Sequence, residues 1–445
     1  MFEPRLYRGM RDFLPQRAIP REEILEKIRR IFRCWGYVPI ETPAIELLST
    51  LLGKYGDEAD KLIYRLEHSD GLGLRYDLTV PLARIMALYG QNLPKPFRRY
   101  QIQPVWRAER AQKQKGRFRE FVQCDVDIIG TASPIADAEI LAISAEILES
   151  LGFSNYRIVL NHRKILRGLV HHAGFSQNDE LSVLRSLDKW DKIGKEGVSE
   201  ELRSKNYPAE LVEKLFQLVS DEGGNWELLA HLKSIEDQRV SEGVNNLQRI
   251  MEHLSAMGVG QDVITFSPRM ARGLDYYTGA IFETVLPDLP DMGSLTGGGR
   301  YDELIAMFSR GQQIPACGTT IGLDRILAAM EQQNLIPKAH THTKVLVTIF
   351  SDELAGEALS FAQKLREQGI ATETFPEPKK LGKQFAYADK WTIPYVVVIG
   401  EYEAKEDLCV LKELASGQQR IVHQNEAVRI LKEILVNNDK EDNNN

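Results

Sequence analysis

The chain has 445 residues, 43% hydrophobic and 27% charged, a composition typical of a soluble globular protein with two or three domains. Its net charge of −7 argues against a protein that coats nucleic acid through an overall basic surface. No apolar run approaches the roughly 20 residues that span a bilayer, and the N-terminal segment MFEPRLYRGMRDFLP lacks the apolar core of a secretory signal. We therefore expect a cytoplasmic enzyme without membrane segments.

The first predicted elements are a helix and an extended segment. Apolar residues between Arg21 and Trp35 recur with the roughly 3.6-residue period of an amphipathic helix, and Gly36 ends it. The following GYVPIETP contains Pro39 and Pro43, which lack the N–H group that a central strand needs. We expect this segment at the edge of a sheet or at an interface.

Two strands are predicted next, at 98–105 and 118–129, joined by a charged loop. Nine basic residues and a single acidic residue lie between positions 95 and 119. Such a run is usually a solvated face or a disordered arm. Here aromatic residues such as Trp106 and Phe118 interrupt it, which favours ordered strands and a site for anions.

Polar residues on these two strands are candidates for a binding site. The sequence has neither a GxxxxGK[ST] phosphate loop nor a GxGxxG dinucleotide turn, so a nucleotide would have to bind through arginines. Because strand side chains alternate, Arg107 and Glu109 share a face, where a guanidinium can bind phosphate and a carboxylate can accept from the adenine amine. Gln123, Asp125 and Asp127 also share a face. Carboxylates on a sheet usually lie at the surface, but the apolar neighbours favour a half-buried pocket floor.

Cysteines and glycines add little chemistry of their own. The four cysteines show no CxxC spacing, so neither a zinc site nor a disulfide framework is indicated. Cys124 alternates away from the polar side chains of its strand and is expected in the core. The three glycines at 297–299 resemble a phosphate cradle, but no helix cap or lysine follows them. We expect them to allow close approach of the backbone to a bound ligand.

The chain is expected to divide into domains by composition. The first would span 1–330 and contain a helical insertion at about 168–257, where Leu, Glu and Lys recur with helical spacing. A linker would follow at 331–343. Between 344 and 436, buried-type strands alternate with helices, which predicts an α/β domain with a largely parallel sheet. The polar tail at 437–445 is predicted to be disordered.

Three segments resemble the motifs of class II aminoacyl-tRNA synthetases. GYVPIETP, after its helix, is similar to motif 1, whose proline lies at a dimer interface. The strand carrying WRAER, the basic loop and the RFRE strand are similar to motif 2, and GTTIGLDRILAAM is similar to motif 3. Motif 3 alone has little specificity, whereas the three in this order are specific. The resemblance implies an α+β catalytic domain built on an antiparallel sheet of six or seven strands.

Further segments resemble the histidyl-tRNA synthetase family in particular. RGLDYYTGAIFE (272–283) is similar to its histidine-specific motif, LTGGGRYDELI (295–305) to the pocket segment that follows, and LRYDLTVPLAR (74–84) to the amino-acid-binding strand and turn of the eukaryotic and archaeal type. The opening YRGMRDFLP also matches, and the C-terminal region resembles the anticodon-binding domain of class IIa enzymes. The resemblance thus covers nearly the whole chain.

The resemblance implies roles for individual residues. Arg107 and Arg272 would be catalytic, holding the α-phosphate of ATP while the histidine carboxylate attacks it. The ATP-binding residues would be Arg107, Glu109, Arg117, Arg272 and Arg325, with Mg²⁺ beside the β- and γ-phosphates. The histidine-binding residues would be Asp77, Leu78, Thr79, Gln123, Asp127, Tyr276 and Tyr277. Among these, Asp77, Thr79 and Gln123 would accept from the ammonium group, and Asp127 and Tyr277 would bind the imidazole nitrogens.

Two of these assignments have alternatives. Many family members carry Glu at the position of Asp127, so the reach of this side chain differs, although the eukaryotic type has Asp. Tyr276 and Tyr277 would also suit ordinary packing on a strand.

The resemblance implies that the chain activates L-histidine with ATP and transfers it to the 3′ end of tRNA(His), as a homodimer in the cytoplasm. One alternative is the non-catalytic regulatory subunit of ATP phosphoribosyltransferase, but such paralogues usually lack the anticodon-binding domain and the RGLDYY segment. A second alternative is an RNA-binding or stress-sensing module. Binding alone would not need Arg107, Arg272 and Arg325 together.

Overall fold

The computed structural model divides into two compact units, one of residues 1–11 and 24–336 and the other of residues 12–23 and 337–445. None of the described helices combines the length and apolar character needed to cross a membrane. The domain limits expected from composition stay predictions. The structure describes residues 3–54, 60–67, 71–271, 276–309, 311–336 and 341–442.

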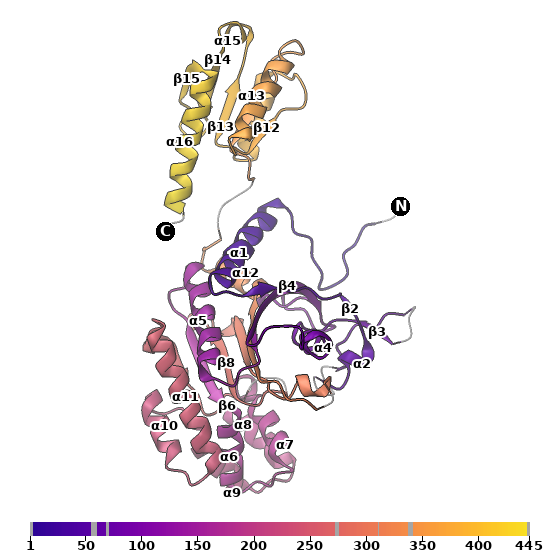
Figure 1. Cartoon of the computed structure of the whole chain (residues 1–445), viewed down its shortest axis with the longest axis vertical. Helices are drawn as coiled ribbons and strands as arrows, with labels where there is room; N and C mark the ends of the chain where they lie inside the picture. Colours follow the sequence, from indigo (N-terminus) through magenta and orange to yellow (C-terminus); the bar gives the residue numbers. More distant parts are fainter. Residues whose placement is uncertain are drawn as a thin grey trace. The chain divides into compact units, whose positions relative to one another are not determined.

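The first unit is built on an eight-stranded sheet (Figure 1). Its six central strands are antiparallel, as predicted, and a short parallel strand is added at each edge, which extends the expected six or seven strands to eight. In spatial order the strands are β1 (Val38–Pro39), β4 (Phe97–Trp106), β5 (Glu120–Ile129), β10 (Ala316–Gly322), β9 (Thr296–Arg300), β8 (Ala280–Val285), β6 (Arg157–His162) and β7 (Ile264–Phe266).

The proline-containing segment forms the edge strand β1, which confirms its predicted place at a sheet edge. Its Val38 side chain is exposed, as are Ile45 and Leu47 of the neighbouring segment. The helix before it, α1 (Pro15–Cys34), starts earlier than the predicted Arg21. Proline suits the first position of a helix because its missing N–H group has no partner there in any case. The smaller elements nearby are β2 (Ile45–Leu47), α2 (Leu48–Leu51), β3 (Leu72–Leu74) and α4 (Thr79–Tyr89).

One face of the sheet packs against helices and forms the main core. Cys124, Val126 and Ile128 of β5 belong to this core and are fully buried, which confirms the predicted place of Cys124. The core also includes residues of α1, α5 (Pro134–Ser150), α11 (Gln238–Ala256) and α12 (Leu323–Gln332). The opposite face of β5 is therefore free to carry polar side chains.

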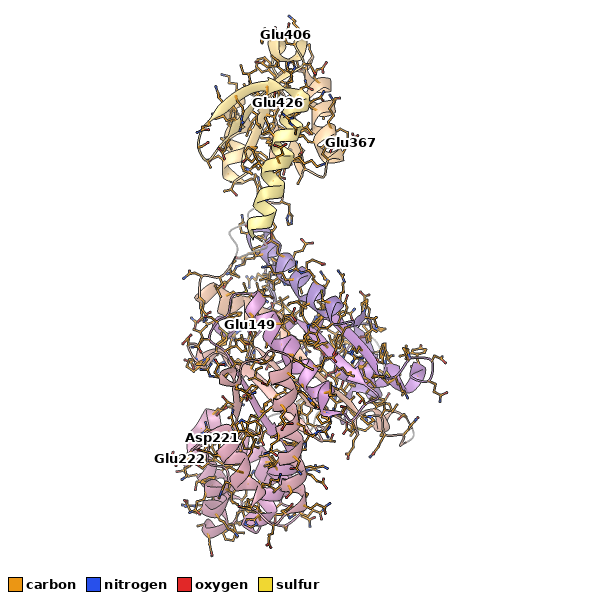
Figure 2. The ribbon with its side chains drawn as sticks, turned by 60° about the vertical axis from the view of Figure 1, so that its left-hand side comes forward. Glu149, Asp221, Glu222, Glu367, Glu406 and Glu426 are labelled. Atoms are coloured by element: carbon orange, nitrogen blue, oxygen red, sulfur yellow. The ribbon has the colours of Figure 1, made fainter. Side chains whose placement is uncertain are left out.

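A run of helices interrupts the sheet between β6 and β7, where the sequence predicts a helical insertion (Figure 1). Asp221, labelled in Figure 2, joins this insertion to the sheet unit, because it accepts a hydrogen bond from the Ser267 hydroxyl at 3.0 Å and forms an ion pair with Arg269 at 2.8 Å. The helices are α6 (Arg163–Ala173), α7 (Glu180–Leu187), α8 (Trp190–Ser204), α9 (Ala209–Leu218), α10 (Asn225–Lys233) and α11.

The second unit contains a five-stranded sheet in the order β12-β11-β13-β14-β15. Three strands are parallel, as predicted, but β14 and β15 form an antiparallel hairpin that the periodicity did not reveal. Its elements are β11 (Val345–Val347), α13 (Ala355–Glu367), β12 (Thr372–Thr374), α14 (Leu381–Lys390), β13 (Tyr395–Val398), α15 (Glu401–Lys405), β14 (Leu408–Glu413), β15 (Gln419–His423) and α16 (Gln424–Asp442).

The last helix extends into the tail at 437–445, and the disorder expected there stays a prediction. Helix α16 continues to Asp442, while 443–445 lie outside the described residues. A helix that is already nucleated adds each further residue with one hydrogen bond, so a polar continuation does not need a core of its own.

The glycines of β9 allow close contacts between neighbouring strands. Their expected role in the approach of the backbone to a bound ligand stays a prediction. A Cβ atom at Gly298 would lie 2.0 Å from the Gly318 carbonyl oxygen of β10, and one at Gly299 would lie 2.9 Å from the Tyr277 ring. At Gly297 the nearest atom, the Phe282 carbonyl oxygen, would be 3.9 Å away.

This difference predicts that Gly298→Ala destabilises the sheet whereas Gly297→Ala does not. The atoms that a Cβ at 298 would meet belong to the backbone and cannot rotate away, so we expect a loss of about 1–3 kcal/mol in the free energy of unfolding. Gly297→Ala should stay within about 0.5 kcal/mol of the unsubstituted chain. Urea unfolding of the full chain measures both, and equal midpoints for the two variants would contradict the packing argument.

Candidate active site

A pocket of about 250 Å³ lies over the polar face of the central sheet. Four separate parts of the chain supply its walls: the turn before α4, the β4–β5 hairpin, the segment from Tyr276 to β9, and the β10–α12 junction. Its lining residues are Asp77, Thr79, Arg107, Glu109, Gly116, Arg117, Phe118, Phe121, Gln123, Tyr276, Tyr277, Ser294, Leu295, Thr296, Gly297, Thr320, Gly322, Asp324 and Arg325.

Strand register arranges the floor in rows, because residues directly opposite each other on neighbouring strands point to the same face. Polar side chains stand on β4 and β5, whereas β10 and β9 carry mostly glycine. The three rows are Gln103, Gln123 and Gly322; Gln101, Asp125, Thr320 and Gly297; and Arg99, Asp127, Gly318 and Gly299. This grid of polar groups and glycines leaves room for a ligand above it.

Arg107 and Gln123 meet in the pocket, as the sequence predicts. The Arg107 guanidinium donates from Nε to the Tyr76 carbonyl oxygen at 3.1 Å and from Nη2 to Gln123 Oε1 at 3.5 Å. It also lies 4.3 Å from the centre of the Tyr76 ring and 5.1 Å from that of Phe121. These contacts orient a permanent positive charge towards a partly buried space, where it can bind an anion.

The β4–β5 loop closes tightly onto the start of α12. Gly116 has a φ of +62°, and a Cβ there would lie 2.6 Å from the Asp324 carbonyl oxygen and 2.7 Å from Arg325 Cα. This approach brings Arg117 and Arg325 to one side of the pocket, as predicted. Arg325 donates to the Ser294 carbonyl oxygen at 2.6 Å.

Asp324 ties this side of the pocket together. Its carboxylate pairs with Arg11 and accepts from the Val122 backbone N–H at 3.0 Å. The Arg11 guanidinium lies 3.5 Å from the centre of the Phe118 ring. The N-terminal segment, β5 and α12 are thus joined at one carboxylate, a connection that the sequence motifs did not suggest.

Five of the seven predicted histidine-binding residues, Asp77, Thr79, Gln123, Tyr276 and Tyr277, line the same pocket. Asp77 lines the pocket and accepts from the Val80 backbone N–H at 3.1 Å, and Thr79 is the first residue of α4. Tyr276 and Tyr277 also line the pocket. They precede β8, which begins at Ala280, so they are not part of a strand, as the alternative of ordinary strand packing would require. Leu78 is fully buried and contributes no side chain to the pocket.

Asp127 lies behind the pocket wall instead of lining it. Its carboxylate is 2.7 Å from Arg99, accepts a hydrogen bond from the Tyr301 hydroxyl, and is 3% exposed. Burial raises the pKa of Asp127, and the Arg99 guanidinium opposes this rise. A buried carboxylate needs a paired charge, which explains why it turns to Arg99. Its predicted contact with imidazole stays a prediction, and would require the carboxylate to shift from these partners.

Sequence reasoning missed several residues of the floor. Thr320 was not singled out, and Asp125 was noted only for its face, yet Thr320 Oγ1 donates to Asp125 Oδ1 at 2.7 Å. Arg99 was one basic residue among many, although its side chain is fully buried. The alternation of β10 would have placed Thr320 on the pocket face once its pairing with β5 was known. The predicted catalytic Arg272 lies outside the described residues.

The fold and the pocket match the architecture that the motifs of class II aminoacyl-tRNA synthetases implied: an antiparallel sheet with a two-stranded hairpin and a strand–helix unit around a polar floor. Residues 9–326 match the histidyl-tRNA synthetase family, and residues 344–434 match an anticodon-binding domain. The chain belongs to the histidyl-tRNA synthetase family.

Individual relatives agree with this placement. The chain is 40% identical to a histidine–tRNA ligase of Gloeobacter violaceus, over 92% of this chain and 94% of the relative. It is also 40% identical to a histidine–tRNA ligase of Rhodopirellula baltica, over 95% and 96%. Among solved structures, a histidyl-tRNA synthetase from Nostoc is similar with a TM-score of 0.87 and 32% identity, covering 97% of this chain and 100% of that one.

Another similar structure, from Bacillus halodurans, is described as an ATP phosphoribosyltransferase regulatory subunit/histidyl-tRNA synthetase. It has a TM-score of 0.72 and 25% identity, and covers 87% of this chain and 97% of that one. The catalytic fold alone therefore does not separate the two activities.

The tight contact at Gly116 predicts a selective effect on ATP. In Gly116→Ala the loop must withdraw from α12, which displaces Arg117 and Phe118, so we expect the KM for ATP to rise about tenfold or more. Gly36→Ala is the matched control, because Gly36 also has a positive φ, +79°, but a Cβ there meets no atom within 4 Å. Both variants pay the strain of the left-handed backbone, about 1–2 kcal/mol. An equal KM for ATP in the two variants would show that the contact has no role.

Proposed function

We propose that the chain is a histidine–tRNA ligase: it activates L-histidine with ATP to histidyl-adenylate, releases pyrophosphate, and transfers histidine to the 3′ end of tRNA(His) with release of AMP. Membership of the family supports this function. The observation that carries it is the convergence of Arg107, Arg117, Arg325 and Gln123 on one pocket, from segments far apart in the sequence.

Arginines would drive the activation step. The histidine carboxylate attacks the α-phosphorus in line with the departing pyrophosphate, and negative charge shifts to the phosphate oxygens, so positioning and charge stabilisation supply most of the catalysis. Arg107, held by Tyr76 and Gln123, would bind the α-phosphate together with Arg272. Arg117 and Arg325 would bind the distal phosphates.

Adenine would lie on the same side of the pocket. Phe118, Phe121 and Glu109 all line the pocket. The Glu109 carboxylate would accept from the exocyclic amine of adenine. This arrangement would fix the base while leaving the phosphates near the arginines.

Histidine would occupy the opposite side. Asp77, Thr79 and Gln123 would accept from its ammonium group. Tyr276 and Tyr277 would form one wall beside the imidazole, since their rings contact each other at 4.9 Å between centres and both line the pocket. Polar partners for both ring nitrogens would exclude amino acids that lack them, because such amino acids would leave the partners unpaired.

Mg²⁺ would accompany the β- and γ-phosphates. The described residues contain no group of three or more His, Cys, Asp or Glu side chains arranged for a metal ion. Proteins commonly hold Mg²⁺ through one or two carboxylates and the phosphates themselves. Asp324 lines the pocket next to Arg325 and is the carboxylate that could reach such an ion, because Glu109 is assigned to the adenine amine; one carboxylate and the phosphates fit an ion that arrives with the nucleotide. Bound there, it would neutralise charge on the departing pyrophosphate.

The chain would act as a homodimer in the cytoplasm, where its tRNA substrate is used. Support for a dimer comes from the edge strand β1 and the exposed apolar side chains around it, among them Val38, Ile45 and Leu47. The C-terminal unit would bind the anticodon region of the tRNA, since it matches an anticodon-binding domain.

A regulatory subunit of ATP phosphoribosyltransferase is the alternative. The Bacillus halodurans protein shows that this description occurs among similar structures. The chain nevertheless carries an anticodon-binding domain and the RGLDYY segment, and its 40%-identical relatives are ligases.

Pyrophosphate exchange with each of the twenty amino acids tests the function. We expect ATP–pyrophosphate exchange with histidine alone, followed by charging of tRNA(His). Hydrogen bonds from Tyr277 and Asp127 to both imidazole nitrogens would make the discrimination against other amino acids reach about 10⁴-fold. Absence of exchange with every amino acid would favour the regulatory alternative.

Arg272→Ala should cut histidine-dependent pyrophosphate exchange by about 10²–10³-fold, the usual effect of losing one electrostatic stabiliser of a transition state. The unfolding midpoint should not change. Arg249→Ala, which removes an exposed arginine from α11, is the control and should exchange normally. Near-normal exchange in Arg272→Ala would refute its catalytic role.

A further inference from the structure

A buried carboxylate lies beneath the amino-acid side of the pocket. Asp125 is 2% exposed and stands on β5 between Gln101 of β4 and Thr320 of β10, its direct cross-strand neighbours. It does not line the pocket, whereas Thr320 and Gln123 do. Hydrogen bonds from Asp125 can therefore reach a ligand only through these two side chains.

Hydrogen bonds connect the three side chains in one direction. Thr320 Oγ1 donates to Asp125 Oδ1 at 2.7 Å. Gln123 Nε2 donates to Thr320 Oγ1 at 3.0 Å and lies 3.5 Å from Asp125 Oδ1. An ionised carboxylate only accepts hydrogen bonds, so it forces the Thr320 hydroxyl proton towards itself and the Gln123 amino group towards Thr320.

The direction of these hydrogen bonds determines whether the oxygen or the NH₂ group of the Gln123 amide faces a ligand. With Nε2 engaged below, the carbonyl oxygen Oε1 faces Arg107 and the pocket. Protonated Asp125 can also donate to Thr320, whose hydroxyl can then donate to Gln123, so the direction of the hydrogen bonds is no longer fixed. In the reversed arrangement the Gln123 amide turns, and its NH₂ group faces the pocket and repels a cation.

We propose that Asp125 is a positioning residue for the amino-acid substrate: through Thr320 it fixes the Gln123 amide with Oε1 towards the pocket, ready to accept from the substrate's ammonium group. This inference rests on the proposed role of Gln123 in binding that group. Neither Asp125 nor Thr320 takes part in the chemistry, so their loss should raise the KM for histidine and leave kcat nearly unchanged.

The charges around Asp125 make the effect depend on pH. The groups that face it are Arg99 on β4, Asp127 on β5, Asp77 before α4 and Tyr277 before β8. Burial raises the pKa of Asp125 to about 7; Arg99 and the Thr320 hydrogen bond oppose this rise, while Asp127 and Asp77 add to it. The carboxylate is therefore ionised above that pH, where the relay has the direction described, and loses this direction as the pH falls below it.

Thr320→Val tests the relay by removing the hydroxyl at nearly constant volume. At pH 8 we expect the KM for histidine in pyrophosphate exchange to rise about tenfold, with kcat and the KM for ATP within about threefold of the unsubstituted enzyme. Thr320→Ser keeps the hydroxyl and should restore the KM. Thr319→Val is the matched control, since the neighbouring Thr319 pairs with Val126 and points to the apolar core.

The pH profile separates a relay from a packing effect. The imidazole of free histidine titrates equally in every assay, so the ratio of the KM of Thr320→Val to that of the unsubstituted enzyme isolates the protein. This ratio should fall from about tenfold at pH 8 towards one at pH 6, where the unsubstituted enzyme has lost the direction of its relay. Asp125→Asn, whose amide can point either way, should show the same trend.

Gln123→Met distinguishes failure of the inference from failure of the proposed site. An unchanged KM for histidine in Gln123→Met would overturn the assignment of Gln123 itself. A raised KM there, with normal values in Thr320→Val, would overturn the relay alone. A ratio that does not vary with pH, or an equal rise in Thr319→Val, would also overturn it.

Discussion

The alternation of side chains along β5 is the constraint on which both the core and the pocket depend. Cys124 and Val126 point into the helix-covered core, while Gln123, Asp125 and Asp127 point to the other face. A shift of register by one residue would exchange the two sets and bury carboxylates among apolar side chains. Packing against the helices therefore determines which groups a ligand meets.

Burial of charged side chains on the polar face of the sheet is costly, and a network of ion pairs and hydrogen bonds compensates for it. Removing an ion from water costs several kcal/mol unless a partner compensates it. Arg99 is 2.7 Å from Asp127 and donates to Gln101 at 3.2 Å, and Gln101 in turn donates to Gln103 at 2.6 Å. Arg75 donates to the same Gln103 oxygen at 3.1 Å. The carboxylates of Asp125 and Asp127 lie near one guanidinium, that of Arg99, so the floor is suited to a positively charged group above it.

Strong periodic patterns predicted most of the fold. The hairpin of β4 and β5, the helical insertion and the β10–α12 junction were all expected from apolar spacing and from motifs. The β14–β15 hairpin was not, because short strands with an exposed face carry a weak local signal.

The candidate site was predicted by residue position but not by side-chain partner. Arg107, Gln123 and Arg325 came together because motif order places their elements around one sheet. The turn of Asp127 towards Arg99 and the bond from Thr320 to Asp125 depend on the register of three strands. No local pattern encodes that register, so these partners became visible only in the folded sheet.

The glycines of β9 and β10 link the stability of the sheet to the selectivity of its pocket. A Cβ at Gly318 would lie 1.9 Å from the Asp127 carboxylate, and one at Gly299 would lie 2.9 Å from the Tyr277 ring. Because Gly318 and Gly299 have no side chains, the Asp127 carboxylate of β5 and the Tyr277 ring can lie against β10 and β9. A larger residue at Gly318 would first displace the Asp127 carboxylate, and one at Gly299 would first displace the Tyr277 ring. The same glycine positions that keep the strands in close contact thus also determine where the Asp127 and Tyr277 side chains lie.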